Sequence, residues 1–283
     1  MHKVNRIVYT PESGIKTPET LIKDLWYSLP KAHALGYRLF LRNLKGMYRQ
    51  SLLGLLWSVV PPLVTSVIWI LLNGQRVVNI EVPGVSYPLF VITGSILWQA
   101  FAEGVNGPVK GVMTGRSMLA KINFPRESLI LSGVYEVIFN ALIKVGLLVI
   151  IFVAFQHIPS WTSVFGILGF ASLILLGSTI GLLLTPLAML YHDIQKGVAI
   201  VLQFAIYLTP VIYPQPDSGM VAELMKFNPV APLLTTTRNF LLGVPVIDLT
   251  TFCWISGISM ILFILGILIY RLVMPIIIER IGS

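Results

Sequence analysis

Apolar residues are grouped along this chain in six blocks, each long enough to cross a membrane as a helix. The blocks lie near residues 52–72, 88–106, 128–155, 161–190, 194–213 and 252–273. Because a membrane-spanning helix needs about 20 predominantly apolar residues, we expect an all-α membrane protein with six transmembrane helices. The pair Pro61-Pro62 falls inside the first block and predicts a kink in its helix.

A basic amphipathic segment precedes the first block and is expected to continue into it without a break. Its cations follow one another at spacings of four, three and four residues, so they form a stripe opposite an apolar face that includes Tyr37 and Phe40. The cations are Arg38, Arg42, Lys45 and Arg49. Such a helix suits the membrane plane, with its cations at the lipid phosphates. The alternative, a solvated face of a soluble helix, does not explain the uncharged run that follows.

An earlier helix is predicted to begin at Thr17-Pro18-Glu19 and to end near Leu29. Thr17 would cap this helix, Pro18 would occupy its first position, and Glu19 would place an acid in its first turn. Residues 1–51 are therefore expected to be a cytoplasmic segment with an amphipathic interface helix. Residues 52–273 would form the six-span domain, and residues 274–283 a cytoplasmic tail. The polar start of the chain also predicts that no cleavable signal peptide is present.

Composition agrees with an integral membrane protein. The 283 residues are 55% hydrophobic and 11% charged, with a mean hydropathy of +0.83, whereas soluble domains carry about 25% charged residues. A net charge of +8 would suggest nucleic acid in a soluble protein, but here most cations flank the apolar blocks. If both termini are cytoplasmic, most of these cations fall on the cytoplasmic side, as the positive-inside rule requires. We expect no nucleic-acid partner.

Two connections are long enough to have a function of their own. The basic connection at residues 109–127 is expected to be cytoplasmic. The connection at residues 214–250 is expected to lie outside and to form short re-entrant helices, because it is apolar but interrupted by prolines. Irregular backbone at membrane depth is tolerated only against protein or a water-filled cavity.

Residues that could carry enzyme chemistry are scarce. The sequence has no Gly-rich phosphate loop that ends in Gly-Lys-Ser or Gly-Lys-Thr, so the chain by itself should not bind ATP. Cys253 is the single cysteine, and the four histidines are scattered without acids or cysteines that would complete a metal set. We expect no enzyme, no metal and no cofactor in this chain.

Ionisable and aromatic residues inside the blocks are the best candidates for a transport path. Glu136, Asn140 and Lys144 recur every four residues and share one helix face, as do Gln99 and Glu103. Charges in a span are unfavourable and usually face a cavity or a partner, so they line a pathway or lock helices together by Glu–Lys pairing. The aromatic residues either line the path, where their flat faces suit a sugar chain, or form an interface belt and core. The conduit-lining set is Trp57, Tyr87, Phe90, Trp98, Phe101, Glu103, Tyr135, Glu136, Phe139, Asn140, Lys144 and Tyr207.

Four short segments, in this order, resemble segments of the membrane subunits of ATP-binding-cassette polysaccharide exporters. They are Arg42–Lys45 with Tyr48–Gly54, Trp57 and Pro61; Lys121–Glu127; His192–Ile194 with Thr209–Pro214; and Phe227–Pro229 with Arg238–Gly243. The resemblance extends from about Arg38 to the C-terminus. Asn43 stands where the family often has Asp, and His192 where it often has Arg, so salt bridges at these two points are not expected.

This resemblance implies a permease subunit of the bacterial inner membrane that pairs with a second copy to form a conduit. Two copies of a separate ATPase, which would hold the ATP and Mg, would dock below. The cargo would be a polysaccharide on a polyprenyl diphosphate, of O-antigen, capsule or teichoic-acid type, and the basic stripe could receive the diphosphate. The implied ATPase-docking residues are Arg38, Arg42, Lys45, Lys121, Phe124, Pro125, Arg126, Glu127, His192 and Asp193. The implied outer gate consists of Pro210, Tyr213, Asn228, Pro229 and Arg238.

Three other functions remain open at this point. The same fold could export a small amphiphile or drug, and depletion would then cause drug sensitivity rather than accumulation of lipid-linked glycan. An ion-coupled transporter could use Glu136 and Lys144 without an ATPase, and it would depend on an ion gradient. A membrane enzyme would need a clustered acid or metal set that this sequence does not offer.

Overall fold

The structure is a computed structural model that describes residues 18–49, 51–52, 54–119, 124–191, 193–216 and 218–282. All the regular secondary structure in these ranges is helical, which confirms the all-α prediction. The elements are α1 (Pro18–Arg49), η1 (Gly54–Ser58), α2 (Val60–Gly74), α3 (Tyr87–Thr114), α4 (Arg116–Leu119), α5 (Glu127–Ala154), α6 (Ser163–Leu190), α7 (Asp193–Ala205), η2 (Ile206–Leu208), α8 (Met220–Lys226), α9 (Val230–Leu242) and α10 (Leu249–Gly282).

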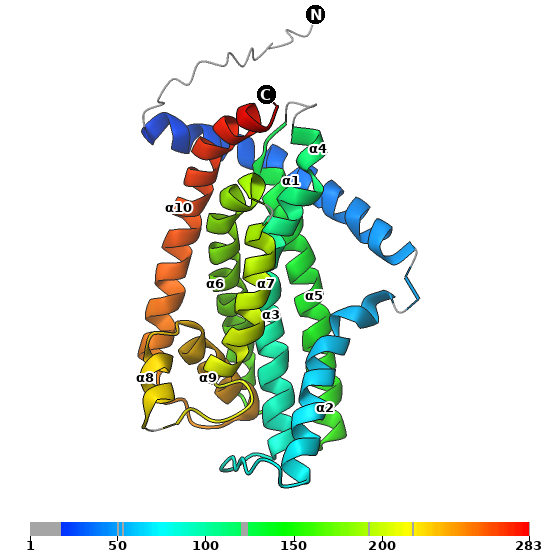
Figure 1. Cartoon of the computed structure of the whole chain (residues 1–283), viewed down its shortest axis with the longest axis vertical. Helices are drawn as coiled ribbons and strands as arrows, with labels where there is room; N and C mark the ends of the chain where they lie inside the picture. The colour runs from blue at the N-terminus through cyan, green and yellow to red at the C-terminus, as the bar shows by residue number, and fades with distance from the viewer. Residues whose placement is uncertain are drawn as a thin grey trace, which may run out of the picture.

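Four helices in the described part of the chain are long and apolar enough to cross a membrane, namely α3, α5, α6 and α10. They run side by side in one bundle (Figure 1). The predicted first and fifth spans correspond to shorter helices, α2 with 15 residues and α7 with 13. The predicted last span continues as helix to Gly282, so the predicted tail extends α10 as far as the chain is described.

α1 lies across one end of the bundle, beside the C-terminal end of α10 (Figure 1). It begins at Pro18, where the cap pattern predicts a helix start, but the predicted end near Leu29 is wrong because the helix continues through Pro30 to Arg49. Pro30 cannot donate the backbone hydrogen bond of its turn, yet the helix runs through it. A Cβ at Gly36 would lie 2.9 Å from the Ser128 carbonyl oxygen, so α1 and α5 approach closely there.

The predicted continuous run from the basic helix into the first span is also wrong. α1 ends at Arg49, and Gly54 then adopts a φ of 51°, a left-handed conformation that suits glycine. Pro61 and Pro62 do not kink a span, because they occupy the first turn of α2. Backbone N–H groups there have no partner within the helix, so prolines are well tolerated.

α3 is the central helix and packs against both α5 and α6. A Cβ on Gly133 of α5 would lie 2.0 Å from the Gly107 carbonyl oxygen of α3. On the other side, a Cβ on Gly181 of α6 would lie 2.1 Å from the Val105 carbonyl oxygen. Small residues at such crossings let helix backbones touch, which is how membrane helices gain packing energy.

Two short helices, α8 and α9, lie at the end of the bundle opposite α1 (Figure 1). They confirm that residues 214–250 contain short helices. α9 packs against α6 through Leu241 and Thr237, and much of it is buried.

Candidate functional site

Two ion pairs join α3 to α5. The Lys144 ammonium nitrogen lies 2.6 Å from a carboxylate oxygen of Glu103, and the Lys110 nitrogen lies 2.5 Å from a carboxylate oxygen of Glu136. Each helix contributes one acid and one lysine, about two turns apart, to these pairs, and because the helices are antiparallel each of these acids meets a lysine. The predicted pairing that locks helices therefore occurs between helices.

A cavity of about 240 Å³ opens beside these pairs, between α3, α5 and η1. Its polar and aromatic lining residues are Trp57, Ser58, Glu103, Asn106, Lys110, Glu136 and Asn140. Met47 of α1 also borders it, so the cavity lies toward the α1 end of the bundle. The Oδ1 atom of Asn140 is buried without a hydrogen-bond partner among the described residues. The site therefore offers acceptor oxygens and one exposed indole ring.

Glu103, Asn106 and Lys110 form a polar strip along α3, and this strip continues beyond the cavity. Asn106 and Lys110 also line a second hollow of about 300 Å³, whose other wall is formed by α7 residues that include Gln195. The side chain of Lys110 is 54% exposed. When the rest of the chain does not cover the polar side chains of a membrane helix, those side chains are expected to face water or another protein.

Four of the predicted conduit residues, Trp57, Glu103, Glu136 and Asn140, are brought together in this cavity. Lys144 is fully buried and lies behind Glu103. Tyr207 is exposed on η2, away from the cavity. Tyr87 is half-buried at the start of α3, and its hydroxyl group has no hydrogen-bond partner in the described part of the chain.

The other aromatic residues of the conduit prediction on α3 are buried against neighbouring helices. Trp98 and Phe101 are buried in the core, with ring centroids 5.3 Å apart. Phe90 is buried beneath the guanidinium of Arg238. The reason is that α3 is enclosed by its neighbours over most of its outer part, so its aromatic residues face other helices.

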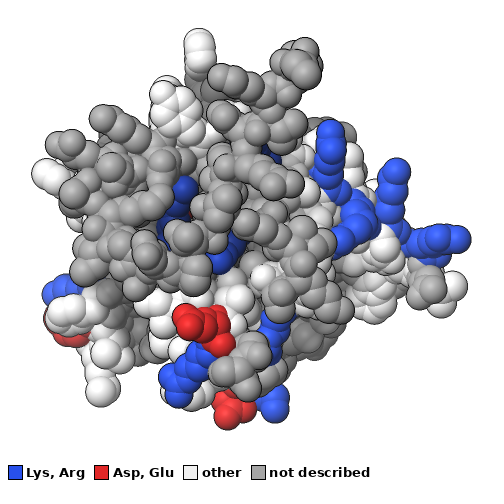
Figure 2. Space-filling view, turned by 90° about the horizontal axis from the view of Figure 1, so that it is seen from above, with Lys and Arg blue, Asp and Glu red and all other residues white. Residues whose placement is uncertain are grey.

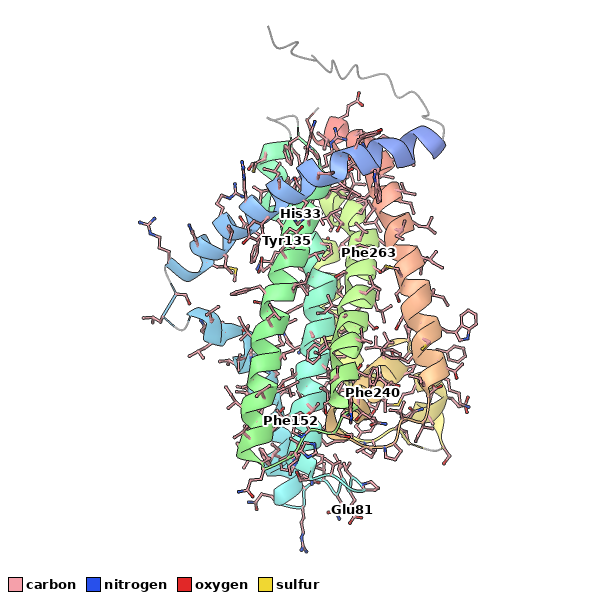
Figure 3. The ribbon with its side chains drawn as sticks, turned by 180° about the vertical axis from the view of Figure 1, so that it is seen from behind. His33, Glu81, Tyr135, Phe152, Phe240 and Phe263 are labelled. Atoms are coloured by element: carbon pink, nitrogen blue, oxygen red, sulfur yellow. The ribbon has the colours of Figure 1, made fainter. Side chains whose placement is uncertain are left out.

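Tyr135 and Phe139 of α5, which also belong to the conduit prediction, pack under α1. Their rings contact Phe40, and the ring nitrogen of His33 is hydrogen bonded to the Tyr135 hydroxyl. Figure 3 shows His33 and Tyr135 together where α1 crosses α5. These aromatic residues fix the position of α1 on the bundle.

The end of the molecule that carries α1 is basic. Arg38, Arg42 and Lys45 are exposed, and lysine and arginine side chains gather along one edge of this end in Figure 2. The Arg42 guanidinium donates a hydrogen bond of 3.1 Å to the Asn43 side chain. Asp193 is exposed at the start of α7, and the predicted docking residues Lys121 and His192 lie outside the described residues.

The Phe-Pro-Arg-Glu segment leads directly into α5 at this same end. Phe124 and Pro125 are partly exposed, and burial lowers the pKa of the Arg126 guanidinium. Glu127 is buried and lies 3.6 Å from Arg271 of α10. The carboxylate of Glu127 therefore joins α5 to α10, and its role in ATPase docking stays a prediction.

The predicted gate residues meet at the opposite end. Arg238 of α9 is buried and donates hydrogen bonds to the carbonyl oxygens of Pro210, at 2.8 Å, and Val211, at 3.4 Å. Asn228 donates to the Leu208 carbonyl at 3.0 Å and accepts from the backbone N–H of Val230 at 2.9 Å. α9 is thus tied to the segment that follows α7.

The remaining two gate residues flank this contact. The Tyr213 hydroxyl donates a hydrogen bond to the carbonyl oxygen of Tyr207, and Pro229 is exposed at the N-cap of α9. Within the ranges that the structure describes, no three His, Cys, Asp or Glu residues lie close enough to hold a metal ion.

A comparison with known protein families shows which family this chain belongs to. A family model described as ABC-2 type transporter matches residues 36–242. The chain belongs to the ABC-2 type transporter family. The matched region includes the cavity, both ion pairs and the helices α8 and α9.

Curated relatives of this ABC-2 type transporter include two bacterial O-antigen export permeases. The O-antigen export system permease protein RfbA of Klebsiella pneumoniae is 27% identical over 240 residues, which cover 81% of this chain and 88% of the relative. RfbA of Myxococcus xanthus is 28% identical over 202 residues, or 69% and 75% of the two chains. The polysialic acid transport protein KpsM of Escherichia coli is 19% identical over 238 residues, or 82% and 91%. The resemblance to ATP-binding-cassette polysaccharide exporter permeases is confirmed.

Sequence reasoning about this ABC-2 type transporter missed Lys110 and Asn106. Lys110 fell in the predicted cytoplasmic connection, whereas α3 continues to Thr114. The available signal was the spacing: Lys110 follows Glu103 by seven residues, two helical turns, and so lies on the same face.

Proposed function

We propose that this chain is the permease subunit of an ATP-driven exporter that moves lipid-linked polysaccharide, of O-antigen type, across the bacterial inner membrane. The observation that carries this proposal is the polar strip of Glu103, Asn106 and Lys110 on α3. It borders two hollows in the bundle. Charged groups at membrane depth are retained where they face an aqueous path. The printed names of the relatives favour a polysaccharide as the cargo.

Two copies of the chain would form the conduit. The polar strip lies between α7 on one side and η1 with α5 on the other, and its residues Asn106 and Lys110 are exposed. A second copy facing this strip across a two-fold axis would enclose a water-filled path. In this arrangement α2 and α7, extended by η1 and η2, supply the first and fifth of six spans, and α9 is a re-entrant helix.

The basic end of the molecule would be cytoplasmic and would receive two copies of an ATPase subunit, which hold ATP and Mg. Helix α1 and the end of α10 lie together there (Figure 1), consistent with two cytoplasmic termini. The exposed docking candidates are Arg38, Arg42, Lys45, Phe124, Pro125 and Asp193. ATP would drive transport by binding with different affinity to the closed and open forms of the dimer.

Quantitative co-purification from the native membrane tests this proposal. The tagged chain is solubilised in several mild detergents, and its partners are identified with their subunit ratios. We expect a nucleotide-binding subunit at a one-to-one ratio, and accumulation of lipid-linked glycan when the chain is depleted. A chain that purifies alone in every detergent, without glycan accumulation on depletion, would contradict the proposal.

The docking surface has a matched control at the opposite end of the molecule. The double substitution Arg42→Ala/Lys45→Ala removes two exposed cations from α1, and we expect several-fold lower ATPase recovery with normal membrane insertion. Lys226→Ala removes an exposed lysine from α8 and should leave recovery unchanged. Equal recovery with the double variant and with Lys226→Ala would remove α1 from the docking surface.

A further inference from the structure

We propose that the cavity between α3, α5 and η1 binds a neutral sugar unit of the exported glycan and disfavours an acidic one. This inference rests on the proposed function and adds the charge class of the cargo at one position of the path. Three properties of the cavity carry it: its charge balance, its hydrogen-bonding atoms with the aromatic ring of Trp57, and its size.

The described charged side chains of the cavity leave no cation without a carboxylate partner. Among the described residues, the charged side chains that line the cavity are Glu103, Lys110 and Glu136, with Lys144 directly behind Glu103. Both ammonium groups already lie within 2.6 Å of a carboxylate, so two positive and two negative charges cancel. An acidic sugar or a diphosphate would face two carboxylates without a free cation, and juxtaposed like charges are unfavourable. A neutral sugar meets no such repulsion.

The hydrogen-bonding atoms suit hydroxyl groups. The buried Oδ1 atom of Asn140 has no partner in the described part of the chain, and it lies on the same helix face as Glu136. Sugar hydroxyls donate readily to amide and carboxylate oxygens, so one ring could satisfy this atom. On the η1 side of the cavity the indole of Trp57 is exposed, and its flat apolar face can cover the C–H face of a sugar ring.

The size of the cavity suits one sugar ring rather than an oligosaccharide. Its volume of about 240 Å³ holds several waters of about 30 Å³ each. It is smaller than the range of about 300–1,000 Å³ typical of pockets for drug-sized ligands. Because Met47 of α1 and the start of η1 border it, the ring would lie near the cytoplasmic end of the proposed conduit.

The test measures two affinities on the full-length protein in lipid nanodiscs, together with any ATPase that co-purifies. The probes are a neutral hexose tetrasaccharide and a sialic-acid tetrasaccharide of the same length, titrated by equilibrium dialysis. We expect the wild-type protein to bind the neutral probe at least about tenfold more tightly, because the carboxylate of the acidic probe would lose hydration without gaining an unpaired cation.

Charge-changing variants then move the preference in opposite directions. Glu136→Gln leaves Lys110 unpaired and should raise the ratio of acidic to neutral affinity by about tenfold, whereas Lys110→Met should lower it. The double variant Glu136→Gln/Lys110→Met is neutral again and should restore the wild-type ratio. Glu223→Gln breaks an exposed ion pair of 2.6 Å on α8 and should not change the ratio. Because each ratio is measured within one variant, partial loss of folded protein cancels.

A wild-type preference for the acidic probe, or a ratio that does not respond to Glu136→Gln, would overturn the assignment. Failure of both probes to bind would also overturn it. Depletion of the chain separates this failure from failure of the proposed function. If lipid-linked glycan still accumulates on depletion, polysaccharide export stands and only the sugar site is wrong.

Discussion

Substitution of either partner of the Glu103–Lys144 ion pair should destabilise the bundle, and the structure predicts that the two losses differ. The Lys144 side chain is 0% exposed, whereas Glu103 is 19% exposed at the edge of the cavity. Glu103→Gln leaves a buried ammonium without its carboxylate, which costs about 3–5 kcal/mol. Lys144→Met leaves a carboxylate that cavity water can hydrate, so we expect a smaller loss of about 1–3 kcal/mol.

The assay is the midpoint temperature at which full-length protein in one mild detergent loses its monodisperse gel-filtration peak after heating. A loss of 1 kcal/mol lowers the midpoint by about 2–4 °C for a chain of this size. We therefore expect the midpoint to fall by about 6–20 °C for Glu103→Gln and by about 2–12 °C for Lys144→Met. The double variant removes both charges and should recover most of the loss, because no buried charge remains unpaired.

The control is Lys226→Met, which breaks an exposed ion pair of the same 2.6 Å length on α8. Exposed pairs contribute about 0–1 kcal/mol, so its midpoint should stay close to that of the wild type. The reasoning is refuted if Lys144→Met is as destabilising as Glu103→Gln, or if the double variant loses the sum of the two single losses.

Two further predictions concern the helix crossing and the outer end. Gly133→Ala places a Cβ 2.0 Å from the Gly107 carbonyl oxygen and should lower stability by about 1–3 kcal/mol. Gly146→Ala on the same helix has open space and should raise stability by about 0.5–1 kcal/mol, so equal midpoints would contradict the crossing. Arg238→Met removes both hydrogen bonds to the segment at residues 210–211, and hydrogen–deuterium exchange at residues 211–213 should rise about fivefold or more. Unchanged exchange there would show that Arg238 does not hold this segment.

The sequence by itself determined the class of the molecule, its apolar helices and its basic amphipathic helix. These properties follow from residues that are close together in the chain, since apolar length and helical spacing are local. The start of α1 at Pro18 and the short helices within residues 214–250 were predictable for the same reason. The ordered motifs also indicated the family before any fold was known.

Only the tertiary structure decided which residues meet. The pairing of Glu103 with Lys144, and of Lys110 with Glu136, depends on the register of two antiparallel helices, which glycines at their crossing fix. The same packing buries Trp98 in the core, although its spacing equally allowed a conduit surface. A side chain's neighbours on other helices are set by long-range contacts that no local pattern encodes, and for this reason the cavity and its charge balance emerged only from the assembled bundle.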